Sequence, residues 1–212
     1  MKILPALVRF IQITTLKNNI DESHGISHSM DVLHYSNEIY QSLAPVHSKL
    51  KDQESIIFTS ALIHDMCDKK YIDPKDGILQ IQSFLTHKLK PYEIHAIEEI
   101  ISTMSYSKVK TDGFPDLGKY QMAYHIVREA DLLTAYDIDR SIIYHLHKST
   151  GNFEDSYKNA RDLFDHRVLQ HHRDNLFVTD YSKRKGAQLH EQALEKIKSW
   201  DHIIQSYEKI SL

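Results

Sequence analysis

Residues 56–65 read Ile-Ile-Phe-Thr-Ser-Ala-Leu-Ile-His-Asp, an apolar run that ends in a histidine and an aspartate. Apolar side chains within it recur at the spacing that places them on one face of a helix, as at Ile57 and Ala61. A carboxylate that follows such an apolar run is costly to bury unless a positive charge compensates it. The stretch therefore predicts a buried helix that leads into a site where charge is compensated.

Amphipathic helices are expected along almost the whole chain, near residues 4–18, 27–43, 50–66, 76–88, 92–106, 119–148, 154–175 and 183–209. Prolines and glycines mark their ends, as in the Asp73–Gly77 turn and in a loop expected from Lys108 to Gly118. Only six glycines and five prolines occur in 212 residues, too few for the many turns of a β-sandwich or barrel. The predicted fold class is therefore all-α.

The chain length is that of one large domain. We expect a single domain over residues 1–212, with a core at about 20–150 and a helical extension at about 151–212, where charged and polar residues alternate. Within this extension, Arg161–Lys185 carries a local excess of basic residues. Solvated helix faces explain such a run more simply than a phosphate-facing lid, and both interpretations stay open.

The charge balance and the single cysteine exclude several classes of protein. Lysine and arginine number 26 against 29 aspartates and glutamates, which gives a formal net charge of −3. Without a broad cationic surface to neutralise phosphates, we expect neither nucleic acid nor a membrane surface as a partner. Cys67 has no second cysteine for an intramolecular disulfide, and it fits a reducing compartment.

The sequence also predicts no membrane span and no export signal. It contains no stretch of 18 apolar residues without a charge. Pro5 and Arg9 interrupt the apolar N-terminal stretch, and no small-residue cleavage site follows it. We interpret the stretch as the first helix and expect a cytoplasmic protein.

Histidine makes up 15 of the 212 residues, which is unusual for a side chain that titrates near neutrality and ligates metals. Solvated helix faces can explain many of these side chains, so their number alone identifies no site. Three short strings concentrate histidines and carboxylates in or at the start of expected helices: His24–His28, Leu62–Asp68 and Arg128–Asp131.

A divalent metal is a simple source of the positive charge that Asp65 needs. The side chains of His64 and Asp65 differ in length, so these helix neighbours can still reach one ion. His28 and Asp131 could complete the ligand set. Two imidazoles and two carboxylates suit a divalent ion such as manganese, iron, magnesium, cobalt or nickel. Structural zinc prefers a closed site with thiolates, and only one cysteine is present.

The order of His28, His64-Asp65 and Asp131 resembles the H…HD…D signature of the HD-domain metal-dependent phosphohydrolase superfamily. The resemblance is stronger to the small nucleotide-hydrolase branch of that superfamily. Its matched pieces occur in order over most of residues 20–145: Asp21–His28 for D-x-S-H-x-x-x-H, His64–Tyr71 for H-D-x-x-D-x-K-F/Y, Glu129–Ala135 for D-A-D-x-L-x-A, and Arg140 five residues later.

This resemblance implies an HD-domain helical bundle with additional C-terminal helices. It implies that His28, His64, Asp65 and Asp131 bind one divalent metal, and that a metal-activated water hydrolyses a phosphate ester or anhydride. Nucleotides are the phosphorylated small molecules that the resemblance favours as substrates. The alternative for the four residues is a set of hydrogen-bonded histidines and salt-bridged aspartates, and the ordered resemblance weighs against it.

The resemblance also implies roles for residues around the ligands. Asp68 falls where relatives place an acidic group beside the attacking water, while its alternative role is to orient a histidine ligand. Lys70 and Arg140 would contact a substrate phosphate, unless each forms an intramolecular salt bridge. His24 precedes His28 by one helical turn and would donate to the same phosphate or support a metal ligand from behind, with a helix cap or a surface role as its alternatives.

The substrate and the reaction class stay open at this stage. Relatives often carry small residues between the last aspartate and the following arginine, whereas this chain has Tyr136, Asp137 and Asp139, which would narrow or repolarise the pocket. An HD-fold oxygenase, which needs further ligands for a second iron, is one alternative function. A non-catalytic binding module clamped by the metal is another. The polar C-terminal third also leaves a homodimer open.

Overall fold

The computed structural model describes residues 3–148 and 152–210. Within these two ranges the chain forms ten α-helices and five short 3₁₀ turns, and no strand occurs in them. The all-α class predicted from the sequence is confirmed. Two compact units divide the chain, Met1–Asp131 and Leu132–Leu212. The domain boundary expected near residues 150–151 lies outside the described residues.

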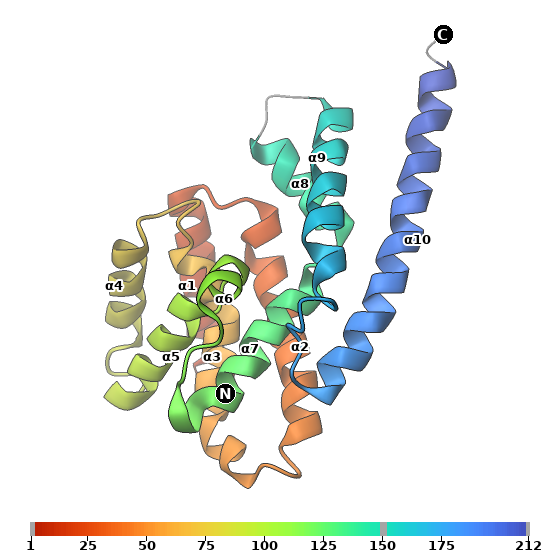
Figure 1. Ribbon diagram of the computed structural model, residues 1–212. Coiled ribbons are helices and arrows are strands. Elements are labelled where there is room, and N and C mark those ends of the chain that lie inside the picture. Colours follow the sequence, from red (N-terminus) through yellow and green to blue (C-terminus); the bar gives the residue numbers. More distant parts are fainter. Residues whose placement is uncertain (1–2, 149–151, 211–212) are drawn as a thin grey trace. The chain divides into compact units, whose positions relative to one another are not determined.

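The helices of the first unit are arranged around α3 (Glu54–Ile63), as Figure 1 shows. Three helices pack against it: α1 (Leu4–Asn18), α2 (Ile26–Leu43) and α5 (Pro91–Thr103). The 3₁₀ turn η3 (His64–Cys67) continues from the end of α3, and α4 (Pro74–Leu85) packs against this turn. The remaining elements of the unit are η1 (Glu22–His24), η2 (Ser48–Gln53), α6 (Tyr106–Asp112), η4 (Gly118–Tyr120) and most of α7 (Gln121–Thr134).

α3 is central because it is apolar on nearly every side. Ile56, Ile57, Leu62 and Ile63 are all fully buried, so the helix has no solvent-facing stripe at its C-terminal end. Burial of each such side chain contributes about 1.5–3 kcal/mol of stability relative to its exposure. The polar residues that follow directly, from His64 onward, are thereby held in the interior of the unit.

The helix expected over residues 50–66 is wrong in detail, because three segments replace it. The backbone of Ile63 leaves the helical region (φ −110°, ψ 7°), and the chain tightens there into η3. The N–H of Asp68 then donates to the carbonyl of Asp65 at 3.1 Å and closes the turn. This local tightening changes the direction in which the side chains of His64 and Asp65 leave the backbone.

The single helix expected over residues 119–148 is also wrong, because the chain breaks between α7 and α8 (Ile138–Lys148). The side chain of Asp137 accepts the N–H of Asp139 at 3.2 Å, which is how a helix N-cap satisfies a backbone donor without an intrahelical partner. The capping aspartate was visible in the sequence. The apolar periodicity on both sides of it masked the boundary.

Two further boundaries differ from the sequence prediction. The loop expected from Lys108 to Gly118 is helical as far as Asp112, where α6 ends at Gly113 with a positive φ of 78°. The helix expected over residues 154–175 ends at His166, because Arg167 leaves the helical backbone (φ −131°, ψ −64°).

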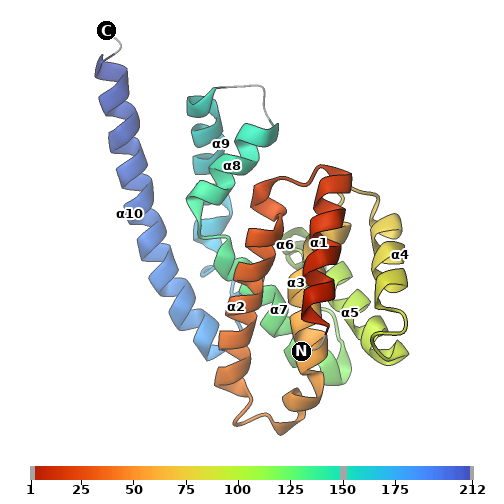
Figure 2. The ribbon, with the colours of Figure 1, turned by 180° about the vertical axis from the view of Figure 1, so that it is seen from behind.

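The second unit contains α8, α9 (Phe153–His166), η5 (Val168–Gln170) and α10 (Asp180–Ile210). α8 and α9 pack side by side, as Figures 1 and 2 show. α10 is tied to α8 by two polar contacts with Asp139: Trp200 donates its Nε1–H to Oδ1 at 2.8 Å, and Lys196 Nζ lies 2.6 Å from Oδ2. Lys196 also lies 3.2 Å from Asp137.

These contacts account for Tyr136, Asp137 and Asp139 within the second unit. Asp137 caps α8 and pairs with Lys196, and Asp139 holds both Lys196 and Trp200. Tyr136 is buried, with only 4% of its surface exposed, and burial raises the pKa of its hydroxyl to about 12. All three therefore contribute to the packing of the second unit.

The basic segment Arg161–Lys185 is partly neutralised within the same unit. The guanidinium group of Arg161 lies 3.2 Å from Asp165 Oδ2 and 3.4 Å from Asp201 Oδ2. Lys183 Nζ lies 3.8 Å from Asp180 Oδ1. These pairs agree with the interpretation as solvated helix faces. Among the described residues, none of the helices has the length and apolar character needed to cross a membrane.

The close approach of Gly77 to η3 generates a prediction. A Cβ atom at this position would lie 2.7 Å from the Cα and Cβ atoms of Cys67. We expect Gly77→Ala to push α4 away from η3 and to lower the free energy of unfolding by about 1–3 kcal/mol, as overpacking does. Urea denaturation measures this loss.

The matched control is Ser83→Ala on the exposed side of the same helix, which should leave stability unchanged or raise it slightly. An unchanged midpoint for Gly77→Ala would contradict the packing of α4 on η3.

Candidate metal centre

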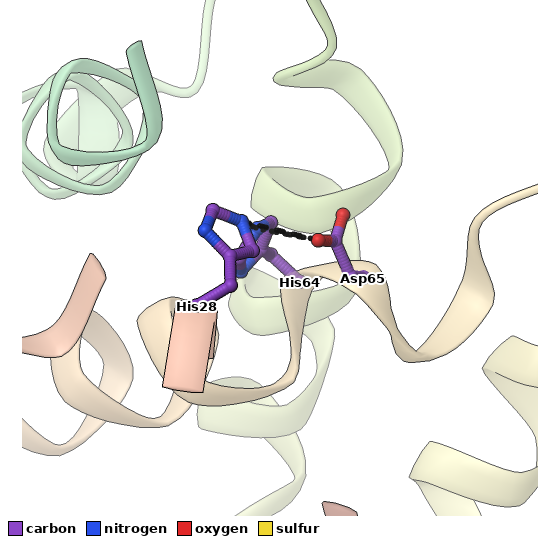
Figure 3. A group of neighbouring side chains, drawn as sticks. All are labelled: His28, His64 and Asp65. Carbon is purple, nitrogen blue, oxygen red and sulfur yellow. Dashed lines mark hydrogen bonds and ion pairs between the residues drawn. The ribbon is translucent and has the colours of Figure 1, made fainter. Parts of the chain in front are cut away.

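Three side chains converge at the junction of α2 and η3: His28, His64 and Asp65 (Figure 3). His28 Nε2 lies 3.1 Å from His64 Nε2 and 3.2 Å from Asp65 Oδ2, and His64 Nε2 lies 3.3 Å from the same oxygen. Both histidine side chains are buried. The structure therefore brings together three of the four residues expected to bind a metal, in a group able to hold an ion.

Asp131, the fourth expected ligand, lies near the end of α7 and contributes its Oδ1 atom to the same place. This oxygen is 3.5 Å from His28 Nε2 and 3.7 Å from His64 Nε2. With 30% of its side chain exposed, it is the most accessible of the four ligand candidates. The residues that the sequence orders as His28, His64-Asp65 and Asp131 thus meet in space.

The separations match those of ligand atoms around one ion. Two atoms that each lie about 2.1 Å from a metal are about 3.0 Å apart at an octahedral angle and about 3.4 Å apart at a tetrahedral one. The three separations among His28, His64 and Asp65 run from 3.1 to 3.3 Å, whereas Asp131 Oδ1 lies slightly farther away, 3.5 and 3.7 Å from the two imidazole nitrogens. Asp65 Oδ2 is buried between the two imidazoles, so its charge is compensated either by a proton on them or by an ion that they share.

Local structure fixes how the His64 ring points. Its Nδ1 atom lies 2.9 Å from the carbonyl oxygen of Ala61, an acceptor, so Nδ1 carries the proton and donates it. The other nitrogen, Nε2, is thereby directed at the group, where it can carry a proton or bind an ion. A histidine that donates its second ring N–H to a backbone carbonyl is typical of metal ligands.

The three ionisable side chains influence one another strongly. Burial alone would lower the pKa of His64, but the charges of Asp65 and Asp131 outweigh it and raise the value to about 9. Burial would raise the pKa of Asp65 and Asp131, yet the nearby imidazoles hold both well below the usual range. Without an ion, a proton on His64 therefore supplies the positive charge that the carboxylates require.

A second group of polar side chains lies beside the first and includes His24, Asp68 and Lys70. The His24 and His28 rings meet edge to face, with 6.1 Å between their centroids. Lys70 Nζ lies 2.9 Å from His24 Nε2 and 3.4 Å from Asp68 Oδ2, and the backbone N–H of Lys70 donates to Asp68 Oδ1 at 2.9 Å. Lys70 thus forms the salt bridge that was its alternative role, and it does so next to the candidate metal centre.

Sequence reasoning assigned no role to three residues that belong to this group: Asp21, Ser23 and Tyr71. Tyr71 donates its hydroxyl to Asp21 Oδ2 at 2.5 Å, and Ser23 donates both its N–H and its hydroxyl to Asp21 Oδ1. Burial would raise the pKa of Asp21, but these hydrogen bonds lower it. The three residues stand inside the matched strings, so their positions were the available signal.

Arg140, the remaining expected substrate contact, is a half-buried residue of α8 and belongs to the second unit. Arg128 and Glu129, which precede Asp131 on α7, are fully buried and form an ion pair at 3.2 Å. Arg128 also lies over the Phe114 ring at 4.7 Å. These two residues anchor the helix turn that carries Asp131.

The comparisons with known proteins concern the fold. No family profile matches the chain, and no curated protein does. The chain is similar to a crystal structure of a Lactobacillus plantarum protein determined as a structural genomics target, with a TM-score of 0.66 and 19% identity. The similarity covers 95% of this chain and 98% of that one. At this identity the likeness shows a shared fold alone.

The raised pKa of His64 predicts a pH dependence that an ion should abolish. In the metal-free protein the folded-state pKa of about 9 exceeds the unfolded value of 6.5, so the proton stabilises the fold fully below pH 6.5. That contribution is lost as the pH rises through about 9. Bound manganese replaces the proton, so the metal-loaded protein should keep its Tm over this range.

Thermal unfolding of chelator-treated and manganese-loaded protein between pH 6.5 and about 9 measures the difference. His95→Ala, which removes an exposed histidine on α5, should leave both curves unchanged. Parallel pH curves for the two forms would contradict the placement of the ion at His64.

Proposed function

We propose that the protein is a metal-dependent phosphohydrolase that cleaves phosphate ester or anhydride bonds, with nucleotides as the favoured substrates. One observation carries the proposal: each of two imidazoles lies within 3.7 Å of each of two carboxylates, with a lysine ammonium group held beside them by His24. A metal that only clamps the fold would not need that ammonium group. The ordered resemblance of the sequence strings supports the same activity.

His28, His64, Asp65 and Asp131 would hold one divalent ion, most favourably manganese. The ion would lower the pKa of a coordinated water and polarise a phosphoryl oxygen. Mixed nitrogen and oxygen ligands suit manganese, magnesium, iron, cobalt and nickel. His64 Nε2 is already aimed at the group, because Nδ1 donates to Ala61. The ring therefore need not rotate for binding, and the ion would replace the proton on Nε2.

The neighbouring side chains would bind the phosphate and accept the proton of the attacking water. Lys70 offers positive charge to an anionic phosphate, and His24 Nε2 lies 2.9 Å from its Nζ atom and holds it beside the centre. Asp68 is the carboxylate available to accept a proton from the attacking water or to orient it. Its Oδ1 atom accepts the backbone N–H of Lys70 at 2.9 Å, and its Oδ2 atom lies 3.4 Å from the ammonium group of that lysine.

The test measures phosphate and pyrophosphate release from a panel of nucleoside mono-, di- and triphosphates with manganese present. We expect metal-dependent release from the wild type, and the product identifies the bond that is cleaved. Asp65→Ala should lower kcat/KM by at least about 100-fold, because loss of even an outer-shell partner costs a metal site 10–100-fold. Asp52→Ala, an exposed aspartate in the same unit, is the matched control and should keep full activity.

The metal used in the assay separates the competing functions. Activity that is retained with magnesium, which is redox-inert, agrees with hydrolysis and contradicts an oxygenase. If no nucleotide is cleaved with any of the five metals while the wild type still binds manganese, the hydrolase proposal fails, and a metal-clamped binding module explains the centre better.

A further inference from the structure

The hydrogen bonds around Asp21 have fixed directions. An ionised carboxylate only accepts, and the serine and tyrosine hydroxyls have one proton each. Ser23 Oγ directs its proton to Asp21 Oδ1, and Tyr71 directs its proton to Asp21 Oδ2. A charged acceptor competes for these protons more strongly than a neutral imidazole nitrogen does. Both hydroxyl protons are therefore committed to Asp21.

The same two hydroxyl oxygens face one nitrogen of His24. His24 Nδ1 lies 2.7 Å from Ser23 Oγ and 3.0 Å from the Tyr71 hydroxyl oxygen. Since neither hydroxyl has a proton left to donate, Nδ1 must be the donor in these contacts. His24 therefore carries its proton on Nδ1.

The other nitrogen of His24 faces Lys70, with Nζ 2.9 Å from Nε2. An ammonium group only donates, so a close contact requires a lone pair on Nε2. A proton on Nε2 would place two donors, and in the imidazolium two positive charges, against each other. One neutral tautomer, with the proton on Nδ1 and the lone pair on Nε2, satisfies the contacts of both ring nitrogens.

We propose that Asp21, Ser23 and Tyr71 are positioning residues that hold His24 in its Nδ1–H tautomer, so that Nε2 holds the Lys70 ammonium group next to the metal centre to bind a phosphate group. The part that concerns phosphate rests on the proposed function, whereas the tautomer does not. The chain of hydrogen bonds runs from the Asp21 carboxylate through two hydroxyls and one imidazole to the ammonium group of Lys70.

The variant Asp21→Asn tests this chain of hydrogen bonds, because asparagine has nearly the same side-chain shape as aspartate. An asparagine offers one oxygen and one NH₂ group, so its NH₂ group donates to one of the two hydroxyls. That hydroxyl then turns its own proton toward His24 Nδ1. The favoured tautomer becomes Nε2–H, which opposes the Lys70 ammonium group. Tyr71→Phe should have a smaller effect, because Ser23 still accepts from Nδ1.

The first measurement is a nitrogen–proton correlation spectrum of the imidazoles in magnesium-loaded protein, with His24→Gln used to assign the His24 signal. We expect a protonated Nδ1 and an unprotonated Nε2 in the wild type and in Tyr71→Phe, and a signal shifted toward the other tautomer in Asp21→Asn. An Nε2–H tautomer in the wild type would overturn the proposal whether or not the protein hydrolyses anything.

The second measurement is calorimetric binding of inorganic phosphate to the same magnesium-loaded proteins. Asp21→Asn should weaken binding by about tenfold, the effect of one hydrogen bond to a charged group. Tyr92→Phe, which removes an exposed hydroxyl on α5, should leave binding unchanged. Magnesium affinity measured in parallel should be the same in all variants, which shows that the fold is intact.

The outcomes are distinguishable from failure of the proposed function. Phosphate binding that is absent in the wild type, or equal in the wild type and Asp21→Asn, would overturn the link between His24 and Lys70. A wild type that has the Nδ1–H tautomer and binds phosphate, yet cleaves no nucleotide, would support the positioning role and contradict hydrolysis alone.

Discussion

The structure depends on the compensation of charge at the end of a buried apolar helix. α3 brings Asp65 into the interior of the first unit, where an unpaired carboxylate is costly. Two imidazoles compensate this charge: α2 supplies His28 and η3 supplies His64, and both lie within 3.3 Å of the carboxylate. Asp131 adds a second negative charge. Two carboxylates and two imidazoles in one place require either a proton or a divalent ion, and the ligand spacing suits the ion.

Apolar periodicity was sufficient to predict the all-α class, because each helix buries one face and the pattern survives in the sequence. It failed where a local hydrogen bond decided the backbone. The break at Asp137 depends on one side-chain cap, and the turn η3 depends on the backbone of Ile63, which no periodic pattern records. The HD-domain bundle itself stays a prediction, since the solved structure that the chain resembles at 19% identity shows only the shared fold.

The candidate site, like the fold, could be predicted from the sequence only in part. The order of histidines and aspartates in the sequence predicted four ligand candidates, and the structure brings these four side chains together. The roles of Asp21, Ser23 and Tyr71 could not be predicted in the same way, because the direction of each hydrogen bond depends on residues about fifty positions apart meeting in space. The residue types in the sequence are enough to suggest metal ligands, whereas the position of each proton follows only from the distances between side chains in the structure.

The bond between His64 Nδ1 and the carbonyl of Ala61 has a further consequence for the rate of ion binding. It satisfies a carbonyl in the last turn of α3 and orients the ring at the same time, so the ligand takes up its position as the helix forms. An arriving ion then meets a ring that does not have to rotate. We therefore expect the association rate to be governed by loss of water from the ion and of the proton from Nε2, so it should depend on the metal and on the pH.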